Sequence, residues 1–485
     1  MKNKANEANQ YIETHRALAA KTSHQPILHF TPSLGWMNDP NGLIFFKGEY
    51  HLFYQYHPYQ TKWHQMYWGH AVSHDLITWQ ELQIALAPSE VYEDSPEGGC
   101  FSGTAIEHEG TLYLFYTAVA KNTAGQLIQK QCVAMSQDGR HFSKYENNPI
   151  IQNDSLGKEN PHFRDPKVWQ KDHTFYMLVG VSQDHVGKLI LYRSENLLEW
   201  TLMDVAFEEP NAWMLECPDF YELDGKDVLT FSPVGIKNEY SSYLIGRMDY
   251  DKGRFQVEKR GILDYGVDFY APQTFLTPEG ERYIIGWQNG WEWMDEWNGF
   301  GELTENSWCG AMSIPRKLKR KGDRLHALLP EKISQLKAAE TVIYDTQTDG
   351  YQKLVSTIQK PTLIELSLEA GKIPITLVFK DKRTGQIDVF TIEEHLSYHS
   401  EGNPLGRKDI TMPLSSKSKT LKILLDLYAI EVFDEDEGTV LSVNSFFKGT
   451  LAREFSFSCS EKARLKQVVV TELNEKQLIK RSLKG

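Results

Sequence analysis

The feature that most constrains this chain is a pair of apolar runs that recurs five times in its N-terminal part. In each copy a short charged turn joins the two runs, as a turn joins the strands of a β-hairpin. The copies span residues 43–56, 105–117, 167–181, 220–232 and 274–287. Successive turns lie roughly 53 to 62 residues apart, slightly beyond the range typical of propeller blades and other repeats. This spacing predicts a repeat architecture.

A second pair of strands follows each of the first four copies. A Ser or Asp stands beside its polar turn and an aromatic residue comes after the turn, as in 73–79, 136–142 and 194–200. Each repeat therefore holds about four strands, and four-stranded units repeated around an axis form a β-propeller. The sequence predicts an all-β fold that begins with a five-bladed β-propeller.

The domain boundaries are predicted from where the repeats begin and end. Residues 1–27 form a polar, helical segment, 28–330 the propeller and 331–341 a linker helix, whereas 342–485 alternates as the strands of a C-terminal β-sandwich do. A chain of 485 residues is also longer than one core usually supports. We find no motif that carries chemistry in 342–485.

Three acidic residues lie at matching places in the repeats. Asp39, Asp165 and Glu216 each precede the turn of their own hairpin by roughly six to nine residues. Ser102 and Tyr270 hold comparable places in the other two copies. Equivalent positions near the start of each innermost strand are expected to face the central channel. We therefore expect three carboxyl groups, distant in sequence, to meet at one site.

Two carboxyl groups on either side of a bond are the machinery of a retaining glycosidase, in which one attacks the anomeric carbon and the other protonates the leaving oxygen. Asp39 is the candidate nucleophile. Pro40 restricts its backbone, and Asn38, Asn41 and Gly42 offer amide donors that would keep its carboxylate ionised. A plain Asx turn would explain the same residues.

Glu216 is the candidate general acid/base. It follows the apolar residues Met214 and Leu215, and partial burial beside two other carboxyl groups would favour the protonated form that an acid needs. A glutamate at a strand end beside a turn is the alternative interpretation. We interpret Cys217, next in the chain, as a small buried neighbour without a chemical role.

Asp165 follows Arg164, which would hold the aspartate in place and offer donors to sugar hydroxyls. Its expected role is to bind two hydroxyls of the ring and to favour a cationic transition state. A plain turn is again the alternative. Stacking faces for a sugar are expected from five aromatic residues near the motifs, namely Trp36, Trp63, Phe101, Tyr270 and Trp287.

Charge, composition and cysteine usage exclude other classes of protein. The formal net charge of −13 argues against a nucleic-acid partner, which would need a basic face. Residues 1–27 lack an apolar core of signal-peptide length, and no run is long enough to be a membrane-spanning helix. The five cysteines are widely scattered, which fits a reducing compartment. We expect a cytoplasmic protein with no membrane partner.

Neither a metal nor a cofactor is expected. His57, His64, His70 and His74 cluster in the sequence, but strands and turns would separate them and no carboxylate completes a known metal spacing. We find no glycine loop that would cradle phosphate and no dinucleotide fingerprint.

The motifs and their order resemble glycoside hydrolase family 32, and within it the bacterial sucrose-6-phosphate hydrolases and invertases. The resemblance covers nearly the whole chain from about residue 25 and is weaker over the C-terminal sandwich. It rests on residues 36–42, Gln55, Trp63, 101–104, 164–166, 216–218 and 268–273.

The resemblance implies that Asp39 attacks C2 of a terminal β-fructosyl unit, that Glu216 is the general acid/base and that Asp165 stabilises the transition state. It implies a sugar-binding pocket without metal or cofactor. The residues expected to bind the sugar are Trp36, Met37, Asn38, Gln55, Trp63, Phe101, Ser102, Arg164, Tyr270 and Trp287.

Other functions stay open at this point. An exo-acting inulinase or levanase would use the same core, although the lack of an export signal argues against polymers outside the cell. A non-catalytic sugar-binding propeller would keep the aromatic residues but would not need Asp39 and Glu216 in activating surroundings. The sequence also leaves open whether glucose must carry a 6-phosphate, and whether the protein is a monomer or a homodimer.

Overall fold

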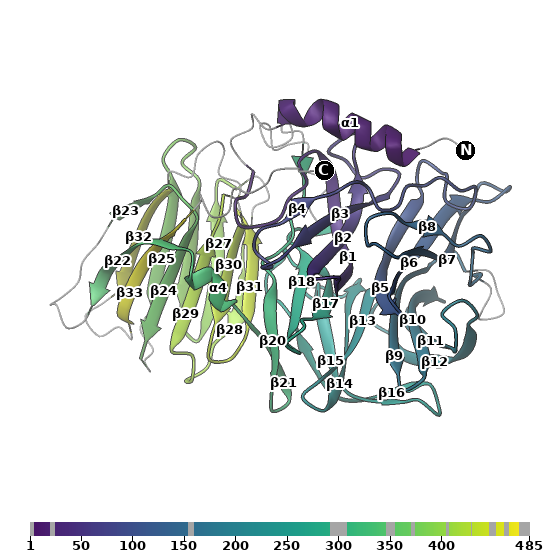
Figure 1. Cartoon of the computed structure of the whole chain (residues 1–485). Helices are drawn as coiled ribbons and strands as arrows, with labels where there is room; N and C mark the ends of the chain where they lie inside the picture. The colour runs from purple at the N-terminus through teal and green to yellow at the C-terminus, as the bar shows by residue number, and fades with distance from the viewer. Residues whose placement is uncertain are drawn as a thin grey trace.

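The computed structural model shows two bodies of strands side by side, a propeller formed by the N-terminal part of the chain and a sandwich formed by the C-terminal part (Figure 1). Among the residues described, no helix is both long and apolar enough to span a membrane. The structure describes residues 4–19, 25–153, 160–291, 308–345, 355–369, 374–403, 407–427, 429–445, 453–459 and 465–474.

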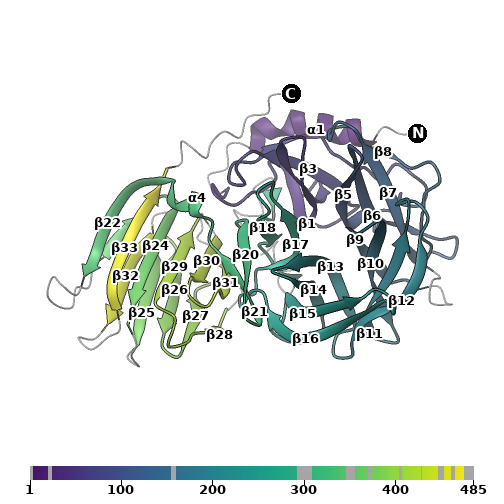
Figure 2. The ribbon, with the colours of Figure 1, turned by 60° about the horizontal axis from the view of Figure 1, so that its bottom comes forward.

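Five sheets stand around a common axis in the propeller (Figure 2). Their innermost strands are β1 (Gly35–Phe46), β5 (Gly99–His108), β9 (Phe163–Lys171), β13 (Met214–Leu223) and β17 (Tyr270–Leu276). The second strands are β2 (Glu49–His57), β6 (Thr111–Lys121), β10 (Thr174–Gln183), β14 (Lys226–Val234) and β18 (Arg282–Trp287). The outer strands are β3 (Tyr67–Ser73), β4 (Gln80–Glu81), β7 (Leu127–Ser136), β8 (Ser143–Lys144), β11 (Val186–Ser194), β12 (Thr201–Glu209), β15 (Ser242–Asp249), β16 (Arg254–Ile262), β20 (Arg316–Lys321) and β21 (Arg324–Leu328).

The innermost strands form a closed ring, in which β1 contacts β5 and β17, β9 contacts β5 and β13, and β13 contacts β17. The short strand β19 (Trp308–Cys309) precedes the outer half of the fifth sheet in the chain but pairs in parallel with β1, Gly35 opposite Trp308. This pairing ties the fifth blade to the first. The predicted class, an all-β fold with a five-bladed propeller followed by a sandwich, is confirmed.

Tight turns set the register of the inner hairpins. Residues 47 and 48, 109 and 110, and 224 and 225 all have positive φ, as two-residue type I′ hairpin turns require. Glycine holds the second position of each turn and adopts this conformation without a steric cost. The charged Gly-containing turns read from the sequence therefore are the hairpin turns.

The blades pack face to face, so most of their strands are buried on both sides. One apolar cluster combines Phe115 and Val133 of the second blade with Val168 and Met177 of the third. Strands with two covered faces contain long apolar runs, which is why the inner hairpins were recognisable in the sequence.

The sandwich has two six-stranded sheets around one core of aliphatic and aromatic side chains. The first sheet holds β22 (Lys337–Asp345), β33 (Leu465–Leu473), β24 (Thr362–Leu368), β29 (Thr420–Leu425), β30 (Ala429–Asp434) and β31 (Val440–Asn444). The second holds β23 (Val355–Ile358), β32 (Arg453–Cys459), β25 (Ile375–Asp381), β26 (Ile387–Ile392), β27 (His395–Glu401) and β28 (Ile410–Pro413).

Two segments flank the propeller. Helix α1 (Lys4–Ala19) lies alongside the first blade (Figure 1), where Asn9 accepts a hydrogen bond from the Ile84 N–H and Arg16 pairs with Glu81. The linker helix predicted over 331–341 is wrong in extent: α4 covers only Glu331–Ser334, and the chain then enters β22. Residues 337–345 pair instead with β33 at the edge of the sandwich sheet, so tertiary pairing takes these residues out of the predicted helix.

Candidate active site

The site is built from an irregularity that all five innermost strands share. Each ladder slips in register near the start of the strand, which marks a β-bulge. A bulge bends its strand and re-aims side chains. The slips fall between Met37 and Pro40, Phe101 and Gly103, Arg164 and Lys167, Glu216 and Asp219, and Tyr270 and Gln273.

Three of the bulges hold a residue in the left-handed region. The φ angles are 66° at Asp165, 47° at Cys217 and 49° at Ala271, and each of these residues precedes a proline. A non-glycine residue pays a steric cost there, and such strain gathers where the surrounding structure fixes a functional geometry. The bulges therefore orient the side chains at the start of the innermost strands, and the strained backbone lowers local stability.

Asp39 lies at the centre of the polar cluster. Ser102 Oγ donates to its Oδ2 at 2.7 Å, the Cys217 thiol approaches the same oxygen at 3.4 Å, and Asn38 Nδ2 donates to Oδ1 at 3.0 Å. Burial nevertheless raises the pKa of Asp39 above its ordinary value, and these donors offset only part of the rise. Asn38 therefore supplies one of the amide donors expected to favour the ionised carboxylate, and burial works against these donors. Asn41 Oδ1 instead accepts the Gly103 N–H at 3.3 Å.

Asp165 is held through the backbone as well as by its side chain. The Cys217 N–H donates to its Oδ2 at 3.0 Å, and its own N–H donates to Thr117 Oγ1 at 2.9 Å. Burial raises the pKa of Asp165 to about 7, against the opposing charge of Arg164, whose Nε lies 3.9 Å from Oδ2. Asp165 and Arg164 are thus neighbours in space, as the motif suggested.

Glu216 is surrounded by polar donors. Arg164 Nη2 lies 2.6 Å and Nε 3.2 Å from Oε1, and the Tyr270 hydroxyl donates to Oε2. Leu215, by contrast, is fully buried on the other side of the strand. Glu216 is half-buried beside two other carboxyl groups, as predicted. The groups that contact its carboxylate are nevertheless polar, because alternation along the strand turns Leu215 to the opposite face.

One pocket of about 710 Å³ contains all three acids. Of the thirteen predicted site residues, those that line it are Asn38, Asp39, Gln55, Trp63, Phe101, Ser102, Arg164, Asp165, Glu216 and Tyr270. They come from all five blades, as the matched positions in the repeats predicted. The guanidinium of Arg164 lies in this pocket beside the carboxyl groups of Asp165 and Glu216.

The other three predicted residues, Trp36, Met37 and Trp287, are buried and stand behind the lining. Met37 and Trp287 are fully buried, so neither can contact a sugar from the pocket. Trp36 donates from Nε1 to Asn38 Oδ1 at 2.7 Å and stacks on Trp291 at 6.1 Å between ring centroids. Trp291 lines the pocket in their place.

Several lining residues were missed. Gln129, on the third strand of the second blade, accepts the Phe163 N–H at 2.7 Å and lies 3.4 Å from Arg164 Nη1. The sequence signal that could have identified Gln129 is the presence of glutamines inside an otherwise apolar strand. Cys217, predicted to have no chemical role, contacts both aspartates. His162, Lys237 and Tyr240 also line the pocket and belong to no recognised motif.

The arrangement suits acid and nucleophilic chemistry on a small polar molecule. Two buried aspartates and one half-buried glutamate carry different donors, so their protons are not equivalent. Within the described part of the chain, no group of three or more His, Cys, Asp or Glu side chains is arranged to hold a metal ion.

Comparisons with known proteins give a consistent result. Residues 29–329 match the N-terminal domain of glycosyl hydrolases family 32. The chain is 35% identical over 446 residues to a sucrose-6-phosphate hydrolase of Zymomonas mobilis, covering 85% of this chain and 84% of that protein.

Solved structures agree. A family 32 β-fructofuranosidase variant from Bombyx mori, in complex with sucrose, superposes with a TM-score of 0.82 at 30% identity, covering 98% of each chain. A sucrose-6-phosphate hydrolase from Lactobacillus gasseri superposes with a TM-score of 0.83 at 25% identity, covering 96% of each chain.

Proposed function

Because the chain belongs to glycoside hydrolase family 32, we propose that it hydrolyses terminal β-D-fructofuranosides with retention at C2, and that Asp39, Asp165 and Glu216 carry the reaction. The enzyme is a glycoside hydrolase. The observation that supports the assignment of residues most directly is that Asp39 and Glu216 line one pocket from different blades, each with its own set of donors.

In the first step Glu216 gives a proton to the leaving oxygen while an Asp39 oxygen bonds to C2 and the C2–O bond breaks. The product leaves and a fructosyl ester of Asp39 remains. In the second step Glu216 takes a proton from water, whose oxygen attacks C2 and releases Asp39. The enzyme thereby returns to its starting protonation state.

The remaining groups stabilise charge. Asp165 lies beside Arg164 and near Asp39 in the same polar cluster. It is proposed to bind fructose hydroxyls and to offset the positive charge that develops at C2. Arg164 and Tyr270 fix the Glu216 carboxyl, so that the proton is delivered along one direction. Aromatic faces for the ring come from Trp63 and Phe101.

The residue assignment is tested by substitution. We expect Asp39→Ala and Glu216→Ala each to lower fructose release from sucrose by at least about 10³-fold, since each removes a group on which the chemistry depends. The matched control is Glu195→Ala, an exposed acid on the third blade, with unchanged turnover. Circular dichroism spectra should be unaltered in all three. Turnover like that of the wild type in either site variant contradicts the assignment.

We further propose that the leaving group is a glucosyl unit that carries a 6-phosphate. The acid faces the leaving oxygen, so the loop that follows β14, the strand paired with the Glu216 strand, borders the leaving group. Lys237 of that loop lines the pocket and is exposed. The nearby acids are neutralised, since Glu97 pairs with Lys121 at 2.9 Å and Glu239 with Arg260 at 2.6 Å. In the described residues Lys237 has no such partner.

A side-by-side assay on sucrose, sucrose 6-phosphate, short fructo-oligosaccharides and inulin tests this. We expect Lys237→Met to lower kcat/KM for sucrose 6-phosphate about tenfold and to change that for sucrose less than twofold, since a phosphate is held by charge-assisted hydrogen bonds. Lys171→Met, at the turn of the third blade, is the control. An equal effect on both substrates rejects the phosphate site, and preference for inulin would favour the inulinase alternative.

The cellular setting is proposed from the state of the cysteines. Four described cysteines, Cys100, Cys132, Cys217 and Cys309, are buried and free, which supports a cytoplasmic, reducing location. We propose a monomer or a homodimer. Light scattering of the purified chain distinguishes the two.

A further inference from the structure

The sandwich touches the propeller at the segment that leads into β17, the strand that carries Tyr270. Residues 264–268 run beside β31 of the sandwich: the Tyr265 N–H donates to Val440 O at 2.8 Å and the Asp268 N–H to Ser442 O at 3.3 Å. A Cβ at Gly266 would lie 1.8 Å from Ser442 O, so only glycine permits this approach. The segment is thus laid along a sandwich strand.

Asp268 anchors the end of this segment. Its Oδ2 accepts the Asn444 N–H at 2.7 Å, and its Oδ1 lies 3.1 Å from Arg407 Nη2. Both partners belong to the sandwich, and Asp268 and Arg407 are buried. A backbone N–H and a guanidinium of the sandwich thus hold the two oxygens of the Asp268 carboxylate.

The anchor lies two residues from the active site. Tyr270 begins β17 and donates its hydroxyl proton to Glu216 Oε2. Between them, Phe269 O accepts from Ser241 Oγ at 2.8 Å, and after them Ala271 has a φ of 49°. A strained backbone keeps such a conformation only when its surroundings hold it, and on the side of Asp268 those surroundings include the sandwich.

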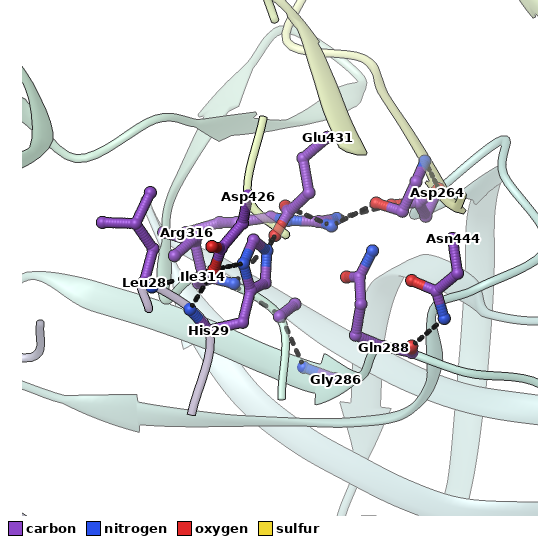
Figure 3. A network of polar contacts seen from close by, with 12 residues as sticks. Leu28, His29, Asp264, Gly286, Gln288, Ile314, Arg316, Asp426, Glu431 and Asn444 are labelled. Carbon is purple, nitrogen blue, oxygen red and sulfur yellow. Dashed lines mark hydrogen bonds and ion pairs between the residues drawn. The ribbon is translucent and has the colours of Figure 1, made fainter. Parts of the chain in front are cut away.

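The same sandwich strand reaches the other wall of the pocket. Asn444 Nδ2 donates to Gln288 O at 2.6 Å, just beyond the end of β18 (Figure 3). Three residues later Trp291 lines the pocket. One residue of the sandwich therefore contacts the segments that lead to both Tyr270 and Trp291.

We propose that Arg407, through Asp268, is a positioning residue for the glycosidase reaction: the sandwich fixes where Tyr270 meets Glu216. The proposal rests on the proposed function, in which Glu216 transfers the proton. Neither Arg407 nor Asp268 lines the pocket. The C-terminal sandwich then has a catalytic consequence without contributing a group to the pocket.

A double-mutant cycle tests the proposal, using Arg407→Met, Tyr270→Phe and the combination. We expect Arg407→Met to lower kcat about tenfold with KM within twofold, because a displaced hydroxyl affects proton transfer more than binding. The basic limb of kcat/KM against pH should move to higher pH, since a donor to the carboxylate is lost. In the Tyr270→Phe background, Arg407→Met should have no further effect on kcat or on the pH profile.

The control is Asp426→Asn, which weakens another buried contact between sandwich and propeller, at His29. It should lower Tm and leave kcat unchanged. Arg407→Lys keeps the charge and should recover most of the lost kcat. Arg407→Gln removes the charge and replaces Arg407→Met if that variant does not fold. The proposal is overturned if Arg407→Met or Arg407→Gln lowers Tm alone, or if its effect on kcat adds to that of Tyr270→Phe. Failure of the wild type to release fructose would instead reject the proposed function.

Discussion

At the scale of single residues, burial outweighs neighbouring donors in setting the ionisation of the two aspartates. Burial raises the pKa of Asp39 despite the hydrogen bonds from Ser102 and Asn38, and it raises that of Asp165 to about 7 despite Arg164. A nucleophile must be ionised to attack. The donors around Asp39 therefore determine how far down in pH the enzyme stays active.

Ser102→Ala is predicted to narrow the active pH range from the acid side. The hydroxyl donates to Asp39 at 2.7 Å and lowers its pKa, so its loss raises that pKa further and Asp39 is protonated at a higher pH. The acid limb of kcat/KM should move upward by about 0.5 to 1 pH unit. The pH profile measures this, with Ser136→Ala as the control. An unmoved or downward-shifted limb speaks against Asp39 as the ionised nucleophile.

Asp165→Asn is predicted to stabilise the fold at high pH while reducing activity. A pKa raised to about 7 means that the folded state binds this proton more tightly than the unfolded state. Stability is therefore lost as pH rises from about 4 to 7, by roughly 4 kcal/mol at most. Asparagine carries no charge at any pH, so the Tm gain over the wild type should be larger at pH 8 than at pH 4.5. Equal Tm differences at both pH values contradict the prediction.

The three acids could be predicted from the sequence because they repeat at one offset, but their contacts could not. Cys217 donates to Asp165 through its N–H and lies against Asp39 through its thiol. These contacts join three different blades. No local pattern encodes them, since they depend on how the bulges of separate strands meet in the channel. The polar setting of Glu216 was missed for the same reason.

At the scale of elements, periodicity located the inner hairpins, and two-residue turns set their register. The bulges were not predicted, because one extra residue in a strand leaves a recognisable run of apolar residues before and after it. The linker was misjudged for a different reason: helix-forming residue types occur after 335, but the free edge of the sandwich sheet pairs with them as β22. Tertiary pairing overrides local propensity in such cases.

Ala271 tests whether the bulge geometry matters. Its φ of 49° in a buried position disfavours a β-branched side chain. Ala271→Val is predicted to cost about 2 to 4 kcal/mol of unfolding free energy and to reduce kcat, because it moves Tyr270. Ala271→Gly should change stability by less than about 1 kcal/mol, since glycine tolerates this φ. Urea unfolding with kinetics distinguishes the two, and equal effects would show that the bulge conformation is unimportant.

At the scale of the whole molecule, a buried ionic network joins propeller and sandwich (Figure 3). His29 bonds Asp426 at 3.0 Å and Glu431 at 2.9 Å, and Arg316 bonds Glu431 and Asp264, each at 2.7 Å. Two cations meet three carboxylates without exposure to water. Such a network is costly to break, because each group removed leaves a charge unpaired.

The network is predicted to make stability depend on pH through His29. Burial lowers the pKa of His29, but Asp426 and Glu431 raise it to about 9. A pKa raised in the folded state stabilises fully below pH 6.5, and this contribution, about 3 kcal/mol, is lost as pH rises to 9. His29→Gln should therefore lower Tm strongly at pH 6 and much less at pH 9.5. A Tm difference that does not shrink with pH contradicts a protonated His29.

In the proposed reaction Asp39 forms a covalent bond to the sugar and Glu216 transfers the proton. Glu216→Ala, given an aryl β-fructofuranoside whose leaving group needs no proton, should complete the first step and stall before the second, which lacks its base. Peptide mapping by mass spectrometry after acid quenching identifies the adduct. We expect a fructosyl ester on the peptide that contains Asp39. An ester on the peptide of Asp165, or product release with inversion at C2 and no adduct, would contradict it.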